Sequence, residues 1–299
     1  MSLHLFDFKE AVAKNYLSAL PTEFKISRTS KYDILIMRLL TSNIDIHSKK
    51  LNRRIKLNQN YTSFPLHQVK RKSTKQLKTL LQPFTLSDYV RFSKKYYGRN
   101  IIFYHNLLQE LTFYFFYTTE KQHQAAFVNL YRILEYISYS FPLLHSSHFG
   151  NYLGSFEAFR SYFTDVKTSE ISFFDKFIEN LYRGTAYLSY TTDFDFSQPD
   201  ITIANACYDA FFGLTKRTNW TTANRATFTL SIENRHLIHL FRNTRNKYFH
   251  FAVGGSRNIQ TTDLKDPDFF FEQINSKYLN WIGFIYGTVI HESLDNALL

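Results

Sequence analysis

The 299-residue sequence has one cysteine and few residues that break helices. Because Cys207 has no partner within the chain, an internal disulfide is excluded and we expect a reducing compartment. Only 9 glycines and 6 prolines are present, which favours long helices over many turns. No glycine-rich loop of the Walker or Rossmann type occurs, so ATP or NAD chemistry is not indicated and we expect no cofactor.

The sequence also lacks an apolar run approaching the roughly 18 residues needed to cross a bilayer. The stretches Ile34–Met37 and Phe113–Tyr117 are too short and are soon followed by charged residues. No charged and then apolar leader opens the sequence as printed. We therefore expect a cytoplasmic protein with no membrane partner.

Hydrophobic residues make up 44% of the chain and charged residues 20%, a balance that indicates a packed core. Aromatic residues are abundant, with 31 Phe and 21 Tyr. Such rings could stack on nucleobases, but they can equally replace leucine in helical cores. Composition alone does not decide between these two roles.

Positive charge is concentrated in the first 100 residues, which carry 20 Lys and Arg against 6 Asp and Glu. Residues 101–299 carry 16 against 19. A one-sided excess attracts polyanions, because binding releases condensed counterions. We predict nucleic-acid contacts for the cations in the densest part, namely Lys49, Lys50, Arg53, Arg54, Lys70, Arg71, Lys72 and Lys75. An acidic protein, a membrane surface or no specific partner are the alternatives.

The spacing of apolar residues predicts an all-α fold. We expect a helical bundle of five or more helices over residues 100–299, preceded by a basic, partly irregular N-terminal region over residues 1–99. Within the bundle, helices are predicted over 101–117, 120–140, 155–163, 172–190, 201–214, 229–253 and 268–298. Pro142 is expected to end the second helix, and 191–199 to form an acidic connector.

The N-terminal region is harder to assign. Apolar spacing predicts a helix over 5–20, whereas the run 33–40 fits either a buried strand or a short helix. Residues 42–83 are polar, basic and weakly periodic, so we expect loops or a short hairpin. Ser87 and Asp88 are expected to cap the helix that follows.

One short segment combines groups suited to phosphate chemistry. Arg245, Asn246 and His250 fall within six positions near the end of the predicted helix 229–253. Arginine supplies a permanent forked cation, asparagine supplies donors and an acceptor, and histidine titrates near neutrality. On a helix, Asn246 and His250 lie one turn apart, and Arg242 lies one turn before Asn246.

This segment resembles the signature of the HEPN superfamily, in which an arginine and a polar residue are followed by three variable residues and a histidine. Residues 127–135 (FVNLYRILE) are similar to the early helix of several prokaryotic HEPN families, where an aromatic-Arg-apolar-apolar-Glu pattern recurs. The resemblance covers roughly residues 100–299. It implies a metal-independent endoribonuclease of a toxin or of an antiviral, abortive-infection defence system, with the active site formed between two subunits of a homodimer.

The resemblance also implies roles for individual residues. His250 would act on the 2′-hydroxyl of RNA or protonate the leaving 5′-oxygen, and Arg245 would neutralise charge on the phosphate. Asn246 would orient His250 or a phosphate oxygen. Glu135 would hold Arg245 or Arg242, and Arg132 would bind a flanking phosphate. The products would be a 2′,3′-cyclic phosphate and a 5′-hydroxyl.

RNA, a second copy of the chain, and an antitoxin or another component of a defence system are the expected partners. HEPN toxins silenced by nucleotidyltransferase antitoxins carry a tyrosine two residues after the histidine, where this chain has Ala252. Regulation by adenylylation at that position is therefore not expected.

Simpler interpretations stay open. Arg245 could pair with Glu233 or Glu135 while His250 caps the helix end. The chain could then be a non-catalytic module of the same fold that binds nucleic acid or protein in a defence complex. The His145–His148 and His236–His239 pairs lack an accompanying carboxylate or cysteine cluster, so no metal site is expected. Cys207 falls in an apolar helical run and is interpreted as a core residue.

Overall fold

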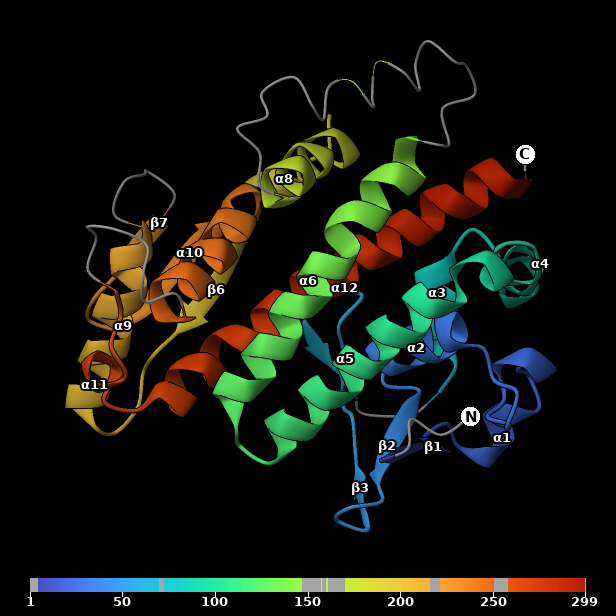
Figure 1. The fold of residues 1–299 in the computed structure, drawn as a ribbon, viewed down its shortest axis with the longest axis horizontal. Coiled ribbons are helices and arrows are strands. Elements are labelled where there is room, and N and C mark those ends of the chain that lie inside the picture. Colours follow the sequence, from blue (N-terminus) through green and yellow to red (C-terminus); the bar gives the residue numbers. More distant parts are fainter. Residues whose placement is uncertain are drawn as a thin grey trace.

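The computed structural model describes residues 5–69, 73–146, 157, 160, 170–215, 221–249 and 258–298. Three long helices form its centre: α5 (Ile101–Thr119), α6 (His123–Ser146) and α12 (Pro267–Leu298). Helix α6 packs against both α5 and α12. In Figure 1 the N-terminal elements lie on one side of this group, and helices α8 to α11 lie on the other.

The N-terminal region begins with an antiparallel sheet of order β1–β2–β3, formed by β1 (Phe6–Glu10), β2 (Ile44–Ser48) and β3 (Arg53–Ile55). The helix predicted over 5–20 is therefore wrong: a strand is followed by the short α1 (Lys14–Leu17) and by the 3-10 turn η1 (Thr22–Phe24). The reason is the period of the apolar residues. Phe6 and Phe8 are buried, at 2% and 8% exposed, whereas Asp7 and Lys9, which alternate with them, are not buried. This alternation is expected of a strand with one buried face.

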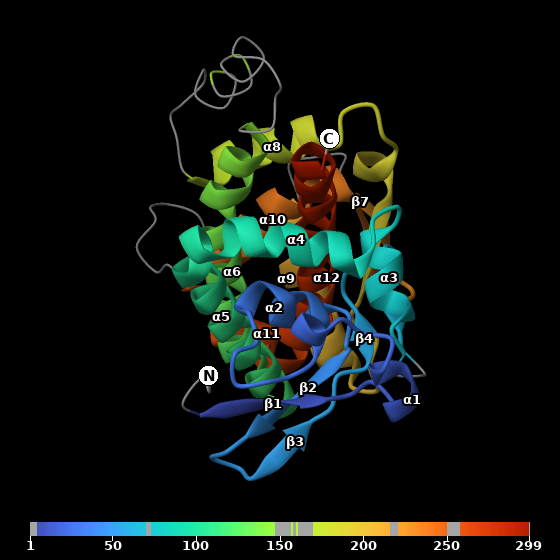
Figure 2. The same cartoon turned by 90° about the vertical axis from the view of Figure 1, so that its right-hand side faces the viewer.

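The ambiguous run 33–40 is a helix, α2 (Tyr32–Leu40), and every residue in it is buried. The segment from 42 to 83 contains two hairpins instead of one. The second pairs β4 (Gln59–Asn60) with β5 (His67–Gln68), and α3 (Lys75–Leu81) follows. Figure 2 shows α2 between the β1–β2–β3 sheet and α4.

The N-cap of helix α4 (Leu86–Tyr96) lies two residues before Ser87, where the cap was expected. Thr85 is the N-cap, its hydroxyl accepts from the Asp88 N–H at 3.2 Å, and Asp88 accepts from the Thr85 N–H at 2.8 Å. This reciprocal pair is a capping box, which satisfies two backbone donors at the helix start. The 3-10 turn η2 (Tyr97–Asn100) then leads directly into α5.

The helices predicted over 101–117, 201–214 and 268–298 correspond to α5, α9 (Ile201–Thr215) and α12. Pro142 was expected to end the second helix. It lies inside α6 instead, and the helix continues to Ser146. A proline in a helix costs about 3 kcal/mol through a lost hydrogen bond and a steric clash. Burial of the neighbouring Phe141, which is 3% exposed, offsets part of this cost.

A second sheet interrupts the helical region. It has the order β6–β8–β7 and comprises β6 (Thr191–Asp195), β7 (Thr221–Asn224) and β8 (Thr229–Glu233). The predicted acidic connector is thus partly a strand. The predicted helix 229–253 is β8, the 3-10 turn η4 (Asn234–His236) and α10 (Leu237–Phe249). Leu230 and Ile232 are 0% exposed and alternate with half-buried residues, as expected of a strand with one buried face.

The remaining elements are α8 (Glu170–Leu181), the 3-10 turn η3 (Tyr187–Ser189) and the short α11 (Thr261–Leu264). The fold is therefore a helical bundle that carries three small sheets, so the prediction of an all-α protein was too simple. Buried side chains from Phe6 to Leu294 form one continuous hydrophobic cluster. The N-terminal region and the later helices share this core. Of the helices described, none has the length and apolar character required to traverse a lipid bilayer.

Candidate functional site

Helix α10 presents a polar face that contains most of the predicted site. Its opposite face is buried through Leu237, Ile238, Leu240, Phe241 and Thr244. Phe241 stacks on Tyr278 of α12, with ring centroids 4.3 Å apart and planes 10° apart. This packing fixes the rotation of α10 and leaves His239, Arg242, Arg245 and Asn246 half-buried on the outer side.

Arg245 is held by two contacts. Its guanidinium lies over the ring of Tyr131 on α6, 4.9 Å from the ring centroid, and its Nη1 donates to Asn246 Oδ1 at 3.1 Å. Within the parts of the chain described above, no carboxylate forms an ion pair with Arg245. Glu233 instead accepts from Arg235 at 2.8 Å, so the simple Arg245–Glu233 pairing is not formed. The guanidinium therefore keeps donors for an external anion.

Arg242 belongs to a separate chain of contacts. Its Nη2 lies 3.3 Å from His239 Nδ1, and His239 Nε2 lies 3.0 Å from Asp175 Oδ2 on α8. The tautomer protonated at Nε2 satisfies both contacts, since it accepts from Arg242 and donates to Asp175. Arg242 is thus directed toward the start of α10, away from the predicted line through Asn246 and His250. Asp175 was not predicted, because its contact with His239 joins two helices that are far apart in the chain.

Arg132 and Glu135 come together on another side of α6. Both line a surface cavity of about 420 Å³ with Phe103, Tyr136, Tyr139 and Ser140. Arg132 Nη1 lies 3.2 Å from Glu110 Oε1 on α5. Burial raises the pKa of Glu110, and the charge of Arg132 opposes that shift. Arg132 therefore has a carboxylate partner of its own, whereas its neighbour Tyr131 contacts Arg245.

Phe249 is the last described residue of α10, and its ring stacks on Phe127 with centroids 5.7 Å apart. The chain returns to this end where the Ile259 N–H donates to the Lys247 carbonyl at 2.9 Å. His250 and Ala252 lie outside the described residues. The structure thus places two of the three predicted catalytic residues, Arg245 and Asn246.

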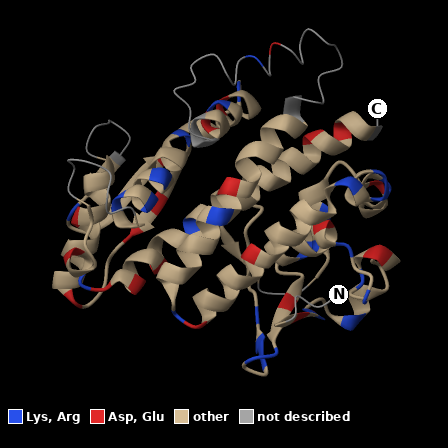
Figure 3. Cartoon of the chain, viewed as in Figure 1, with Lys and Arg blue, Asp and Glu red and all other residues tan. Residues whose placement is uncertain are grey.

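The hairpin that joins β2 to β3 carries four of the predicted nucleic-acid-binding cations, and all of them are exposed. Figure 3 shows the cluster of basic residues at its tip. Lys49 lies 3.2 Å from Asp7, Arg54 lies 2.8 Å from Asp45, and Arg53 pairs with Glu120. The structure describes no ion pair for Lys50 or for Lys75 at the start of α3. Lys70, Arg71 and Lys72 lie outside the described residues.

The Lys49–Asp7 and Arg53–Glu120 pairs are partly exposed on both sides and contribute little to stability, between 0 and about 1 kcal/mol each. A polyanion could therefore replace these two carboxylates at small cost, whereas Asp45 is buried and would retain Arg54. The hairpin remains suited to phosphate contact even though three of its cations have acidic neighbours.

Other sequence candidates have structural roles or lie apart. Cys207 is fully buried, as predicted, and its thiol lies 3.4 Å from the Leu264 carbonyl. Burial raises the pKa of this thiol to about 12, so it does not ionise at neutral pH. Over the described ranges, no group of three or more His, Cys, Asp or Glu side chains is arranged to hold a metal ion.

Comparison with known proteins gives no relative for this chain: no family model, no curated protein and no solved structure matches it.

Proposed function

We propose that the chain is a HEPN-like, metal-independent endoribonuclease that acts as a toxin or an antiviral defence effector. The observation that carries the proposal is the environment of the Arg245 guanidinium. This half-buried group contacts the ring of Tyr131 and the side chain of Asn246, and it has no carboxylate partner among the described residues. In the sequence, Arg245 precedes His250 by five positions. A positioned guanidinium with unused N–H donors can stabilise the negative charge that develops on the oxygens of a scissile phosphate.

In the proposed reaction, the 2′-oxygen of RNA attacks the adjacent phosphorus and the bond from phosphorus to the 5′-oxygen breaks. The proton of the 2′-hydroxyl passes to a base, and the leaving 5′-oxygen takes up a proton. His250 performs one of these transfers. In a homodimer with the site at the interface, the second copy of His250 would perform the other.

Arg245 would bind the non-bridging oxygens as negative charge develops on them, and Asn246 would orient His250 or one of these oxygens. The contact between Arg245 and Asn246 supports a shared task for the two residues. Arg132 and Glu135 line a cavity on another side of α6, where Arg132 would receive a flanking phosphate after exchange with Glu110.

The direct test is cleavage of total RNA by the purified chain in the presence of EDTA. We expect wild type to cleave and to leave 2′,3′-cyclic phosphate and 5′-hydroxyl ends, whereas His250→Ala and Arg245→Ala lose the activity. Arg235→Ala is the matched control, because Arg235 is bound to Glu233 beside the same helix and should be dispensable. Equal cleavage by wild type and His250→Ala, or cleavage that EDTA abolishes, would refute the mechanism.

A non-catalytic nucleic-acid-binding module is the second candidate, and the exposed cations of the β2–β3 hairpin favour it. In this case the chain binds RNA without cutting it, and its expression does not slow growth. Lys50→Ala and Lys75→Ala test the contact in the His250→Ala background. Each lost phosphate contact to single-stranded RNA should reduce the slope of log affinity against log salt by about 0.7. Growth arrest by wild type but not by His250→Ala would exclude this alternative.

A further inference from the structure

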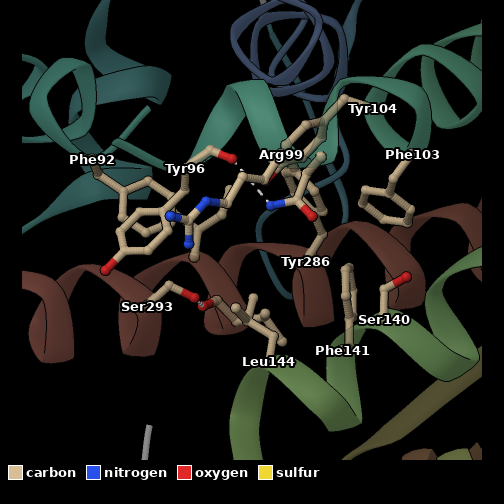
Figure 4. A pocket seen from close by; sticks show the side chains of 13 residues that line it. Phe92, Tyr96, Arg99, Phe103, Tyr104, Ser140, Phe141, Leu144, Tyr286 and Ser293 are labelled. Atoms are coloured by element: carbon tan, nitrogen blue, oxygen red, sulfur yellow. Dashed lines mark hydrogen bonds between the residues drawn. The ribbon is translucent and has the colours of Figure 1, made fainter. Parts of the chain in front are cut away.

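A cavity of about 500 Å³ lies between α4, η2, α5, α6 and α12, away from the polar face of α10. Its size falls in the range of small-molecule sites. Phe92, Phe103, Phe141 and Tyr286 contribute aromatic walls, and Ile290 adds an aliphatic one. Figure 4 shows side chains from the α4–α5 segment facing those of α6 and α12 across this space.

The mouth of the cavity is polar and positively charged. Arg99 and Asn100 are exposed on η2, and Arg99 extends from the ribbon into the pocket. Across the described part of the chain, Arg99 forms no ion pair with a carboxylate. Asn100 Nδ2 donates to the Tyr96 carbonyl at 3.1 Å, which leaves its side-chain oxygen available as an acceptor. An anionic group would complete this arrangement.

Tyr286 lines the cavity with its ring and not with its hydroxyl. The side chain is 4% exposed, and its hydroxyl oxygen is fully buried on the core side, near Asp33 and Tyr89. Burial raises the pKa of this hydroxyl well above its ordinary value, so it stays neutral. Tyr286 therefore adds an aromatic surface and no polar contact to the cavity.

One serine adds an acceptor on the wall. Ser140 is half-buried and donates to the Tyr136 carbonyl at 3.0 Å, so its hydroxyl uses its hydrogen within α6 and keeps lone pairs for a donor in the cavity. Ser293 also lines the cavity, but it is 1% exposed and donates to the Val289 carbonyl at 2.7 Å. A hydrocarbon chain would leave the Ser140 acceptor and the Arg99 cation without partners.

We propose that this cavity binds a nucleoside monophosphate, with the flat heteroaromatic base between the aromatic side chains and the phosphate at Arg99. An exocyclic amino group of a base can donate to the Ser140 hydroxyl or to the Asn100 side-chain oxygen. Stacking on aromatic rings contributes about 1–3 kcal/mol per base, largely without regard to sequence. No residue of α10 lines the cavity, so the proposal does not depend on the proposed ribonuclease activity.

Isothermal titration of the whole chain with AMP, GMP, CMP and UMP tests this proposal. We expect saturable, one-to-one binding of at least one of them, and weaker binding of the matching nucleoside and of inorganic phosphate. Arg99→Gln should weaken monophosphate binding about tenfold or more and leave the nucleoside unaffected, because only the phosphate contact is removed. Arg91→Gln is the matched control, since Arg91 is an exposed cation of α4 that pairs with Asp88.

Two further variants locate the ligand. Phe103→Ala removes one aromatic wall and leaves Arg99 in place, so it should weaken nucleoside and monophosphate by the same factor of about five or more. Arg245→Ala should leave binding unchanged. The proposal fails if no monophosphate binds more tightly than about 1 mM, or if phosphate alone binds equally well. It also fails if Arg245→Ala abolishes binding while Arg99→Gln does not, which would place the nucleotide in the proposed ribonuclease site.

Discussion

The Arg245 guanidinium lies 4.9 Å from the ring centroid of Tyr131, and this contact joins the end of α10 to the middle of α6. Tyr131 is itself fixed, because its ring meets Phe241 edge to face at a centroid distance of 5.7 Å. The electron-rich face of the ring attracts the cation without using its N–H donors. The sequence segments around Tyr131 and Arg245, one on each helix, therefore meet through this pair.

Tyr131→Leu is expected to reduce RNA cleavage about fivefold or more, because it removes an attraction of about 1 kcal/mol that positions Arg245. Tyr131→Phe retains the ring face and should cleave at nearly the wild-type rate. The measurement is kcat/KM on a short RNA with EDTA present, after a check that both variants are folded. Equal activity of the Leu and Phe variants would show that the ring does not position Arg245.

Two glycines of α12 provide a test of the packing between this helix and the N-terminal region. A Cβ atom at Gly283 would lie 2.5 Å from the Tyr61 carbonyl oxygen, whereas one at Gly287 would meet only the end of the Leu80 side chain, at 2.8 Å. Backbone cannot yield as a flexible side chain can. We expect Gly283→Ala to lower the free energy of unfolding by about 1–3 kcal/mol.

Gly287→Ala is the control, because Leu80 can change rotamer and alanine gains up to about 1 kcal/mol over glycine in a helix. Its free energy of unfolding should stay close to that of wild type. Urea denaturation of the three proteins gives the comparison. If Gly283→Ala is as stable as Gly287→Ala, the close approach of α12 to Tyr61 is not formed in solution.

The sequence predicted the long central helices well and the strands poorly, for a physical reason. Helices such as α5 are set by a local period of apolar residues over many turns. Strands here are short, and their apolar residues, such as Phe6 and Phe8, also fit a helical spacing when seen alone. Their pairing partners, Ser48 and Ile46, lie some 40 residues away, so local sequence cannot identify the sheet.

The same distinction applies to the candidate site. Arg245 and Asn246 are neighbours in sequence, and their contact follows from the motif. Tyr131 belongs to the aromatic-Arg pattern that was noted in the sequence of α6, but its contact with Arg245 was not predicted. The ion pair between Arg132 on α6 and Glu110 on α5 was not predicted. Contacts between helices depend on rotation and tilt, which a single sequence does not specify.

Arg38 is a buried cation whose removal should destabilise the chain strongly. It is 0% exposed and donates to both Glu10 carboxylate oxygens, at 3.0 and 2.5 Å, and to the Phe24 and Asn43 carbonyls. Arg38→Met would leave these acceptors without their donor. We expect the free energy of unfolding to fall by about 3 kcal/mol or more.

Arg91→Met is the comparison for Arg38→Met, because Arg91 pairs with Asp88 on the surface of α4 and should cost less than about 1 kcal/mol. Both values come from urea denaturation at neutral pH and moderate salt. A small loss for Arg38→Met, similar to that for Arg91→Met, would mean that the acceptors around Arg38 find other donors or water.

Glu292 near the end of α12 should make stability depend on pH. Burial, together with the negative charge of Asp295, raises the pKa of this carboxyl from 4.5 to about 7 in the folded chain. The folded state therefore binds the proton more tightly than the unfolded state does. Its contribution to stability is complete below pH 4.5 and is lost as the pH rises through about 7.

Glu292→Gln removes this titration, because the amide stays neutral at every pH. We expect the variant to be more stable than wild type at pH 8 and to show a flatter dependence of the free energy of unfolding between pH 4.5 and 7. Asp295→Asn should shift the wild-type transition to lower pH, since it removes the neighbouring charge and leaves the burial. Denaturation series from pH 4.5 to 8 would measure both effects. A variant that is less stable than wild type at pH 8 would mean that Glu292 is charged and favourably paired in the folded chain.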